Sequence, residues 1–267
     1  MLDQLSITII LGLIQGFSEW LPISSTAHLR VAEHFIGFQA TPLFNVVLHA
    51  GTLGVVIFYF RHEIKAVLSA MVHLDFHSEY GRFIPLIVVA TIPGGVIGVL
   101  YNIFLSDSYQ TLLIMGVTFL VGAVIVYCSK FGKEKTPQIS YKTALLMGTA
   151  EGAASFPGLS RSGATIATGL LSGVTREKVF TFSFLASIPA IIGNIAVDAY
   201  LQRGNFLAES ALFNPLYLAV GLAVTAVAGY VAIVLVRKLV LSKKFYYFAA
   251  YTFTLGAILI VLSILGY

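Results

Sequence analysis

The chain has 267 residues, of which 58% are hydrophobic and only 10% are charged, and its mean hydropathy is +0.90. Soluble domains carry about 25% charged residues, so this composition excludes an ordinary soluble protein and predicts one that crosses a membrane several times. The formal charge of +4 comes from basic residues between apolar segments, which indicates loops that set membrane topology and no nucleic-acid partner. The single cysteine, Cys128, excludes an intrachain disulfide and a cysteine-based metal site.

The first apolar stretch covers about residues 5–36 and is interrupted by "EWLPISSTAH". Continuous apolar segments follow, each long enough for the roughly 20 residues that a bilayer core requires. They lie near 44–61, 83–103 and 110–129. A second interrupted stretch covers about 143–173 and contains "FPGLSRSGAT". Three more continuous segments then lie near 179–200, 215–236 and 246–266.

Each half of the two interrupted stretches is too short to span the bilayer comfortably. Proline ends a helix and serine or threonine caps the next one, so each stretch is expected to form a hairpin of two short helices. A turn inside a membrane is tolerated only where it is buried in protein or faces a cavity. The alternative is a full span kinked at proline. We predict an all-α polytopic membrane protein with six transmembrane helices and two re-entrant helical hairpins.

Basic residues divide unevenly between the two sides of this arrangement. The side that collects most of them holds Arg61, Lys65, Arg82, Lys130, Lys133, Lys135, Lys142, Arg176, Lys178, Arg237, Lys238, Lys243 and Lys244. The other side holds Arg30 and Arg203, while Arg161 lies in the second hairpin. Because lysine and arginine concentrate in cytoplasmic loops, the basic side is expected to face the cytoplasm. Both termini and the mouth of the first hairpin are then expected on the outer or periplasmic side of the plasma (inner) membrane.

The two interrupted stretches resemble each other, which predicts an internal repeat. The matched pairs are Gly12 and Gly148, Gln15 and Glu151, Gly16 and Gly152, and Pro22 and Pro157 with a one-residue slip. The glycines are interpreted as sites of close helix packing. Each half holds one hairpin and three spans, and because three is odd the halves must be inverted in the membrane. We expect a single integral-membrane domain, 1–267, with inverted repeat halves near 1–130 and 140–267.

Polar residues gather in both interruptions, and broken helices in inverted repeats typically meet at a site for small polar or charged ligands. The candidates are Gln15, Glu19, Ser24, Ser25, Thr26 and His28 from the first hairpin, and Ser160, Arg161, Ser162 and Thr165 from the second. Guanidinium, hydroxyl groups and helix N-termini suit an anion with several oxygens, such as a phosphate. A serine near a base is a candidate nucleophile and a histidine is a candidate proton donor, which suits phosphoryl transfer.

Structural roles are the alternative for these residues. Each hydroxyl can simply cap a helix, His28 can be a core histidine, and Glu19 can be the ion-pair partner of Arg161. Arg161 is the hardest to explain in this way, because an arginine at mid-membrane costs roughly 2.5–3.5 kcal/mol on the lenient insertion scale. His49, which lies in a span, is assigned a packing or cavity role.

Both interruptions resemble motifs of a known family. "QGFSEWLPISSTAH" is similar to the (E/Q)xxxE and PxSSTxH motifs, and "PGLSRSGAT" to the PGxSRSxxT motif, of the undecaprenyl-diphosphate phosphatases, the bacitracin-resistance family. The resemblance implies a membrane enzyme that hydrolyses undecaprenyl (polyprenyl) diphosphate to the monophosphate and inorganic phosphate, recycling the lipid carrier of cell-wall synthesis and giving bacitracin resistance. It also implies a divalent cation, Mg²⁺ or Ca²⁺, which Glu19 and the substrate phosphates would hold. A homodimer is left open.

The resemblance also implies roles for single residues. Arg161, Ser160 and Thr165 are expected to grip the terminal phosphate, and Ser25 to attack it. Glu19 would orient or deprotonate Ser25 or hold the metal, and His28 would protonate the leaving oxygen or activate water. Further phosphate-binding candidates are Ser162, Ser24, Thr26 and Gln15. The alternative function is a polyprenyl-phosphate transporter or flippase with the same broken-helix site.

Overall fold

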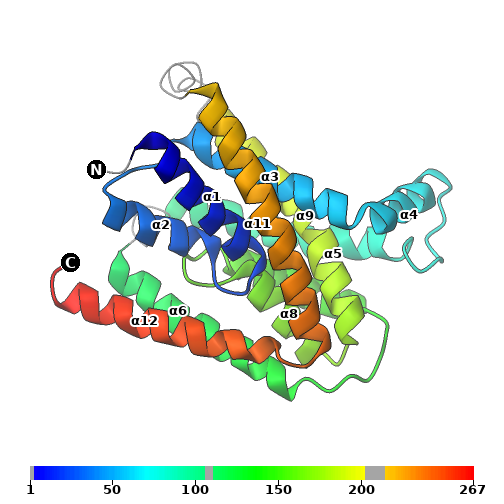
Figure 1. The fold of residues 1–267 in the computed structure, drawn as a ribbon. Coiled ribbons are helices and arrows are strands. Elements are labelled where there is room, and N and C mark those ends of the chain that lie inside the picture. The colour runs from blue at the N-terminus through cyan, green and yellow to red at the C-terminus, as the bar shows by residue number, and fades with distance from the viewer. Residues whose placement is uncertain (1–2, 106–110, 202–213) are drawn as a thin grey trace.

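The computed structural model describes residues 3–105, 111–201 and 214–267, and these ranges fold almost entirely into α-helices (Figure 1). Within them, six helical segments are long and apolar enough to cross a membrane. They are built on α3 (Pro42–Tyr59), α5 (Phe83–Phe104), α6 (Leu112–Cys128), α9 (Arg176–Leu201), α11 (Pro215–Leu241) and α12 (Phe248–Ile264). The prediction of an all-α polytopic membrane protein with six spans is confirmed.

Some helices run beyond the apolar pattern from which they were predicted. The helix α11 continues past residue 236 to Leu241, and α9 begins at Arg176 instead of near 179. Arginine and lysine are good helix formers, and positive charge in the last turn of a helix is favourable. Hydropathy therefore marks the membrane-embedded part of a helix and not its ends. The short turns η1 (Ser129–Phe131) and η2 (Phe245–Tyr247) flank α6 and α12.

Four shorter helices form two pairs at the predicted interruptions. The first helix pair is α1 (Gln4–Trp20) with α2 (Ser25–Ile36), and the second helix pair is α7 (Tyr141–Ala153) with α8 (Arg161–Leu171). At 1.5 Å per residue, α2, α7 and α8 reach about 16–20 Å, well short of the roughly 30 Å of a hydrocarbon core. The breaks thus fall where proline and the serine-rich turns placed them. The re-entrant course of each pair in a membrane stays a prediction.

The glycines of the repeat lie where two helices approach most closely. The helix α1 packs on α11, and its repeat counterpart α7 packs on α5. A Cβ atom added to Gly16 would lie 2.6 Å from the carbonyl oxygen of Thr225, and one added to Gly148 would lie 2.0 Å from that of Ala90. Both distances are too short for a side chain, so the interpretation of these glycines as close-packing sites is confirmed.

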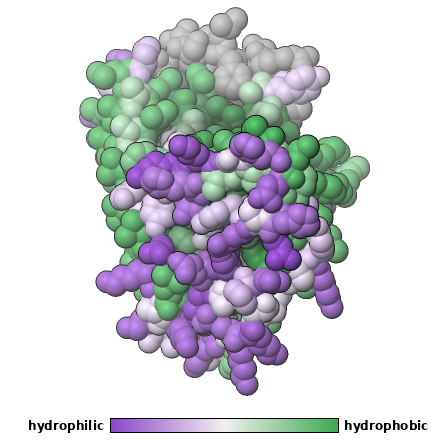
Figure 2. All heavy atoms as spheres, turned by 90° about the vertical axis from the view of Figure 1, so that its right-hand side faces the viewer, coloured by the Kyte–Doolittle hydropathy of each residue, from purple (hydrophilic) through white to green (hydrophobic). Residues whose placement is uncertain are grey.

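The two ends of the molecule differ in character. The start of α1 and the C-terminus lie at one end in Figure 1, and the short helix α4 (Arg61–Val72) lies at the other. Figure 2 shows that hydrophilic side chains gather on the face at the α4 end. Exposed lysines and arginines of that end include Lys65, Lys133 and Lys244. The segregation of basic residues is therefore present in the described ranges; Arg203 lies outside them.

Candidate active site

The turns of the two helix pairs touch each other. Gly158 donates its backbone N–H to the hydroxyl oxygen of Ser24 over 3.0 Å, and the Ser162 hydroxyl donates to the carbonyl oxygen of Leu21 over 3.2 Å. The Ser160 hydroxyl lies 3.5 Å from the same carbonyl. Segments about 140 residues apart in the sequence thus meet tip to tip, as expected from the repeat.

Ser24 has an unusual backbone conformation for this contact. It precedes α2 with φ at 68°, a region that costs a residue with a side chain of order 1–3 kcal/mol, and its hydroxyl does not cap the helix. Helix capping was the structural alternative that the sequence offered for this hydroxyl. Instead, the hydroxyl turns to the second helix pair and accepts from Gly158, whose own φ is 105°. The contact between the tips therefore helps to hold Ser24 in a backbone conformation that a residue with a side chain disfavours, whereas glycine adopts a positive φ freely at 158.

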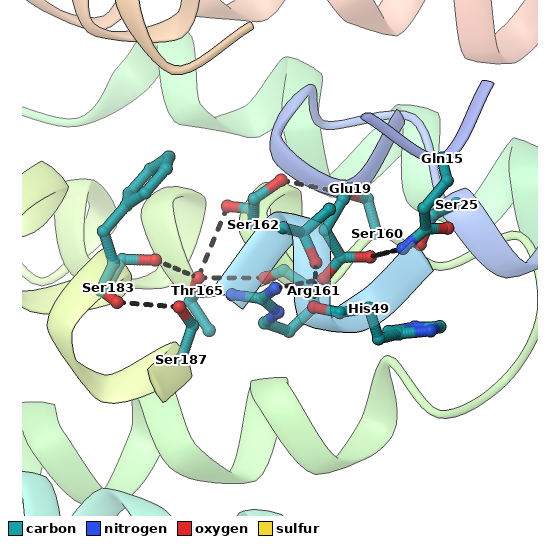
Figure 3. Close-up of polar contacts among 12 residues, drawn as sticks. Gln15, Glu19, Ser25, His49, Ser160, Arg161, Ser162, Thr165, Ser183 and Ser187 are labelled. Atoms are coloured by element: carbon teal, nitrogen blue, oxygen red, sulfur yellow. Dashed lines mark hydrogen bonds and ion pairs between the residues drawn. The ribbon is translucent and has the colours of Figure 1, made fainter. Parts of the chain in front are cut away.

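Glu19 is the centre of the polar cluster at these tips (Figure 3). Its Oε1 lies 2.5 Å from Nη2 of Arg161, while its Oε2 accepts from the Ser25 hydroxyl at 2.7 Å and from the Gln15 amide at 3.2 Å. The side chains of Glu19 and Arg161 are only 8% and 17% exposed. One carboxylate therefore joins a guanidinium from α8, a hydroxyl from α2 and an amide from its own helix in a nearly dry environment.

Arg161 occupies a position that helix stability does not favour. It is the first residue of α8, where the positive end of the helix dipole disfavours a cation. Two neighbours compensate: the Glu19 carboxylate, and the Trp20 ring, whose centroid lies 5.3 Å from the guanidinium carbon. Trp20 is fully buried and stacks on Phe184 of α9 at 5.0 Å. The guanidinium is thus fixed in place beside the N-terminus of a helix, an arrangement that attracts an anion.

A family comparison agrees with this geometry. Residues 8–258 match the family model described as "Bacitracin resistance protein BacA". The chain belongs to the BacA family. The match includes both helix pairs and the tips where they meet.

Named relatives of the BacA-family chain are similar over nearly their full length. An undecaprenyl-diphosphatase of Methanosphaera stadtmanae is 36% identical over 281 residues, covering 99% of this chain and 99% of the relative. One of Syntrophotalea carbinolica is 34% identical over 262 residues, covering 96% and 97%. Undecaprenyl-diphosphatase 3 of Bacillus cereus is 35% identical over 261 residues, covering 95% of each chain.

The predicted site residues of this BacA-family chain fall into two groups. The acid, the guanidinium and the candidate nucleophile are joined directly, as Glu19, Arg161 and Ser25. The other hydroxyls of the second helix pair have structural partners: Ser160 caps α8 by accepting from Gly163, and Thr165 bonds to Ser183 of α9 at 2.6 Å. Their role as phosphate ligands stays a prediction. Thr26 is exposed.

His28 is near the cluster but is not hydrogen-bonded to Ser25. Its Nδ1 lies 2.8 Å from the Ser24 carbonyl oxygen, and its Nε2 lies 2.7 Å from the hydroxyl of Tyr251. The carboxylate of Glu19, and not the imidazole, is therefore the partner of the candidate nucleophile.

Several residues of the site were not predicted from the sequence. His49 of α3 is close enough to Glu19 to interact with it electrostatically, and Glu151 of α7 interacts in the same way with Arg161. Glu151 is buried and its Oε1 has no hydrogen-bond partner among the described residues. A histidine and an acid inside apolar segments were the available signals for these two. Trp20 and Tyr251 gave no signal, because aromatic residues are common in spans.

The side chains around Glu19 do not supply enough metal ligands for a site on their own. In the described part of the chain, no three histidine, cysteine or acidic residues lie close enough together to hold an ion. Both Glu19 oxygens are engaged, one by Arg161 and the other by Ser25 and Gln15. A divalent cation at this site would therefore need Glu19 together with oxygens of the substrate phosphates, and its participation stays a prediction.

Proposed function

We propose that this BacA-family protein is an undecaprenyl-diphosphate phosphatase, which converts a polyprenyl diphosphate to the monophosphate and inorganic phosphate. The observation that carries the proposal is the hydrogen-bonded chain Ser25–Glu19–Arg161 where the two tips meet. The relatives named undecaprenyl-diphosphatase support the choice of substrate. The product would re-enter cell-wall synthesis as a carrier lipid, and its recycling would confer resistance to bacitracin.

The side chains suggest how the reaction proceeds. Arg161 and the free N–H groups at the start of α2 and α8 bind the terminal phosphate. The Ser25 oxygen attacks this phosphorus while its proton passes to Glu19, which already accepts a hydrogen bond from it at 2.7 Å. The new O–P bond gives a phosphoserine, and the P–O bond to the polyprenyl monophosphate breaks.

His28 acts in this proposal either as the leaving group departs or in the hydrolysis that follows. It protonates the leaving monophosphate oxygen or activates the water that hydrolyses the phosphoserine. Further contacts to the phosphate groups are assigned to Ser160, Ser162, Thr165, Ser24, Thr26 and Gln15.

Phosphate release from polyprenyl diphosphate by the purified protein in detergent tests this function. Ser25→Ala is expected to lower kcat by on the order of 10³-fold or more, because the nucleophile is lost. Ser172→Ala is the matched control, since this exposed hydroxyl at the end of α8 only bonds to the Thr168 carbonyl. Ser25→Ala with wild-type activity would favour direct attack by water. A wild-type protein that releases no phosphate would favour the transporter alternative.

Four finer statements are also proposals. The same assay with a chelator tests whether a divalent cation takes part through Glu19 and the substrate phosphates. Both termini and the mouth of the first helix pair are placed on the outer or periplasmic side, supported by the basic residues at the opposite end. A homodimer would have twice the protomer mass of 28.8 kDa in detergent. The repeat halves 1–130 and 140–267 are supported by the equivalent packing of α1 on α11 and α7 on α5.

A further inference from the structure

Three aromatic or backbone neighbours hold the imidazole ring of His28. Its Nδ1 lies 2.8 Å from the Ser24 carbonyl oxygen, and its Nε2 lies 2.7 Å from the hydroxyl oxygen of Tyr251 on α12. The rings of His28 and Tyr251 stack with their centroids 5.7 Å apart and 13° between their planes. Phe119 of α6 meets the imidazole edge-on at 5.5 Å. Both the position and the tilt of the ring are therefore determined by its surroundings.

The chemistry of these partners determines where the hydrogen atoms lie. A backbone carbonyl only accepts hydrogen bonds, so Nδ1 of His28 carries a hydrogen. In the neutral imidazole, Nε2 then has the lone pair and accepts from the Tyr251 hydroxyl. In the charged imidazolium, Nε2–H donates to the Tyr251 oxygen instead. A hydroxyl is both donor and acceptor, so Tyr251 keeps its bond to His28 in both protonation states.

We propose that Tyr251 is a positioning residue, which holds Nε2 of His28 in place in the substrate-free protein; during turnover a substrate or water oxygen replaces the Tyr251 hydroxyl at Nε2 and exchanges the proton with it. The inference rests on the proposed acid–base role of His28. A proton-transfer group must keep its place before and after it gives up its proton. A carbonyl partner could bond only the protonated Nε2, and an ammonium partner could bond only the unprotonated Nε2. Tyr251 comes from the other half of the chain, so α12 contributes to the site through this hydroxyl.

Tyr251→Phe tests the proposal, because phenylalanine retains the stacked ring and removes only the hydroxyl. We expect kcat for phosphate release to fall by about tenfold, comparable to one lost hydrogen bond, with KM within about twofold of wild type. In a His28→Ala background, the same substitution is expected to have no further effect, since it acts through His28. Tyr247→Phe is the matched control: this exposed tyrosine lies four residues earlier and packs against Tyr246.

Three kinetic outcomes would overturn the proposal. One is wild-type kcat in Tyr251→Phe, and another is a raised KM with unchanged kcat, which indicates direct contact with substrate. The third is an equal loss of kcat in the wild-type and His28→Ala backgrounds, which indicates a structural role.

The ¹⁵N NMR signals of the His28 ring separate this inference from the proposed function. In substrate-free protein, the Nε2 chemical shift is expected to change in Tyr251→Phe and to stay the same in Tyr247→Phe. An unchanged Nε2 shift in Tyr251→Phe overturns the positioning role even if the enzyme is a phosphatase. Full activity of His28→Ala overturns the acid–base role of His28, and with it the need for positioning, whatever the shift shows.

Discussion

At the scale of single residues, the buried ion pair of Glu19 and Arg161 does two things at once. It neutralises two charges that would be expensive to leave alone in a nearly dry site, and it orients the carboxylate toward Ser25. Arg161 also lies over the Trp20 ring, which a planar guanidinium can stack on. The arginine side chain therefore has three separate properties at this position: a positive charge, a planar fork of N–H donors and a flat face that stacks on an aromatic ring.

The conservative substitution Arg161→Lys separates these properties, since it keeps the charge and loses the planar fork. We expect kcat to fall by on the order of 10²-fold, because an ammonium group cannot bind a carboxylate or phosphate through two parallel hydrogen bonds. Phosphate release at saturating substrate measures the effect. The control is Arg237→Lys, at an exposed pair with Glu177 3.5 Å away, which should keep wild-type activity. Equal activities of the two variants would mean that Arg161 supplies only charge.

At the scale of helices, close contacts through glycine fix where each short helix ends and hence where the tips lie. The helix α7 lies against α5 with no room for a side chain at Gly148, and α1 lies against α11 in the equivalent way at Gly16. The polar tips follow directly after these packed segments, so a shift of α1 or α7 would move Glu19 or Arg161.

Gly148→Ala is therefore expected to destabilise the fold by about 1–3 kcal/mol through overpacking. The midpoint of thermal unfolding in detergent, followed by circular dichroism, measures it. Gly95→Ala is the control, because an added Cβ on this glycine of α5 meets no atom within 4 Å among the described residues. That substitution should be neutral or stabilising by about 0.5–1 kcal/mol, since alanine is the better helix former. A midpoint for Gly148→Ala at or above that of Gly95→Ala would contradict the packing argument.

The sequence predicted the helices better than the contacts between them, for a physical reason. Hydropathy and helix-breaking residues act locally, so the spans and the breaks near Pro22 and Pro157 could be located from the order of residues alone. Glu19 and Arg161 were found because charge inside an apolar segment is costly. The bond between His28 and Tyr251 joins residues 223 positions apart, and no local pattern encodes it. The hydroxyl of Ser24 was assigned to phosphate binding, with helix capping as the alternative; its bond to Gly158 could not be found from the sequence, because Gly158 comes from the other turn.

At the scale of the whole molecule, the arrangement has two chemically different ends. Hydrophilic side chains cover the end around α4, and the start of α1 and the C-terminus lie at the opposite end. An ion pair at the α4 end, Arg176 with Glu134 at 3.2 Å, connects the start of α9 to the loop that follows η1. The basic loops should hold this end at the cytoplasmic surface.

Labelling of single cysteines tests this orientation in a Cys128→Ser background. Gln39→Cys, in the exposed loop before α3, is expected to react with a membrane-impermeant maleimide on intact cells. Lys133→Cys, in the exposed loop after α6, should react only after the cells are permeabilised. The reverse pattern would place the termini in the cytoplasm, and labelling of both positions on intact cells would contradict the span assignment.

The packing of α1 on α11 and of α7 on α5 has a consequence for biogenesis. Each helix pair is completed by a span from the other half of the chain, so neither half can mature on its own. The ribosome makes α1 first but reaches residue 215 of α11 only 195 residues after Trp20, about 10–40 s later at ordinary elongation rates. During that interval, the newly inserted first helix pair lacks its partner and depends on lipid, the translocon or a chaperone for shelter.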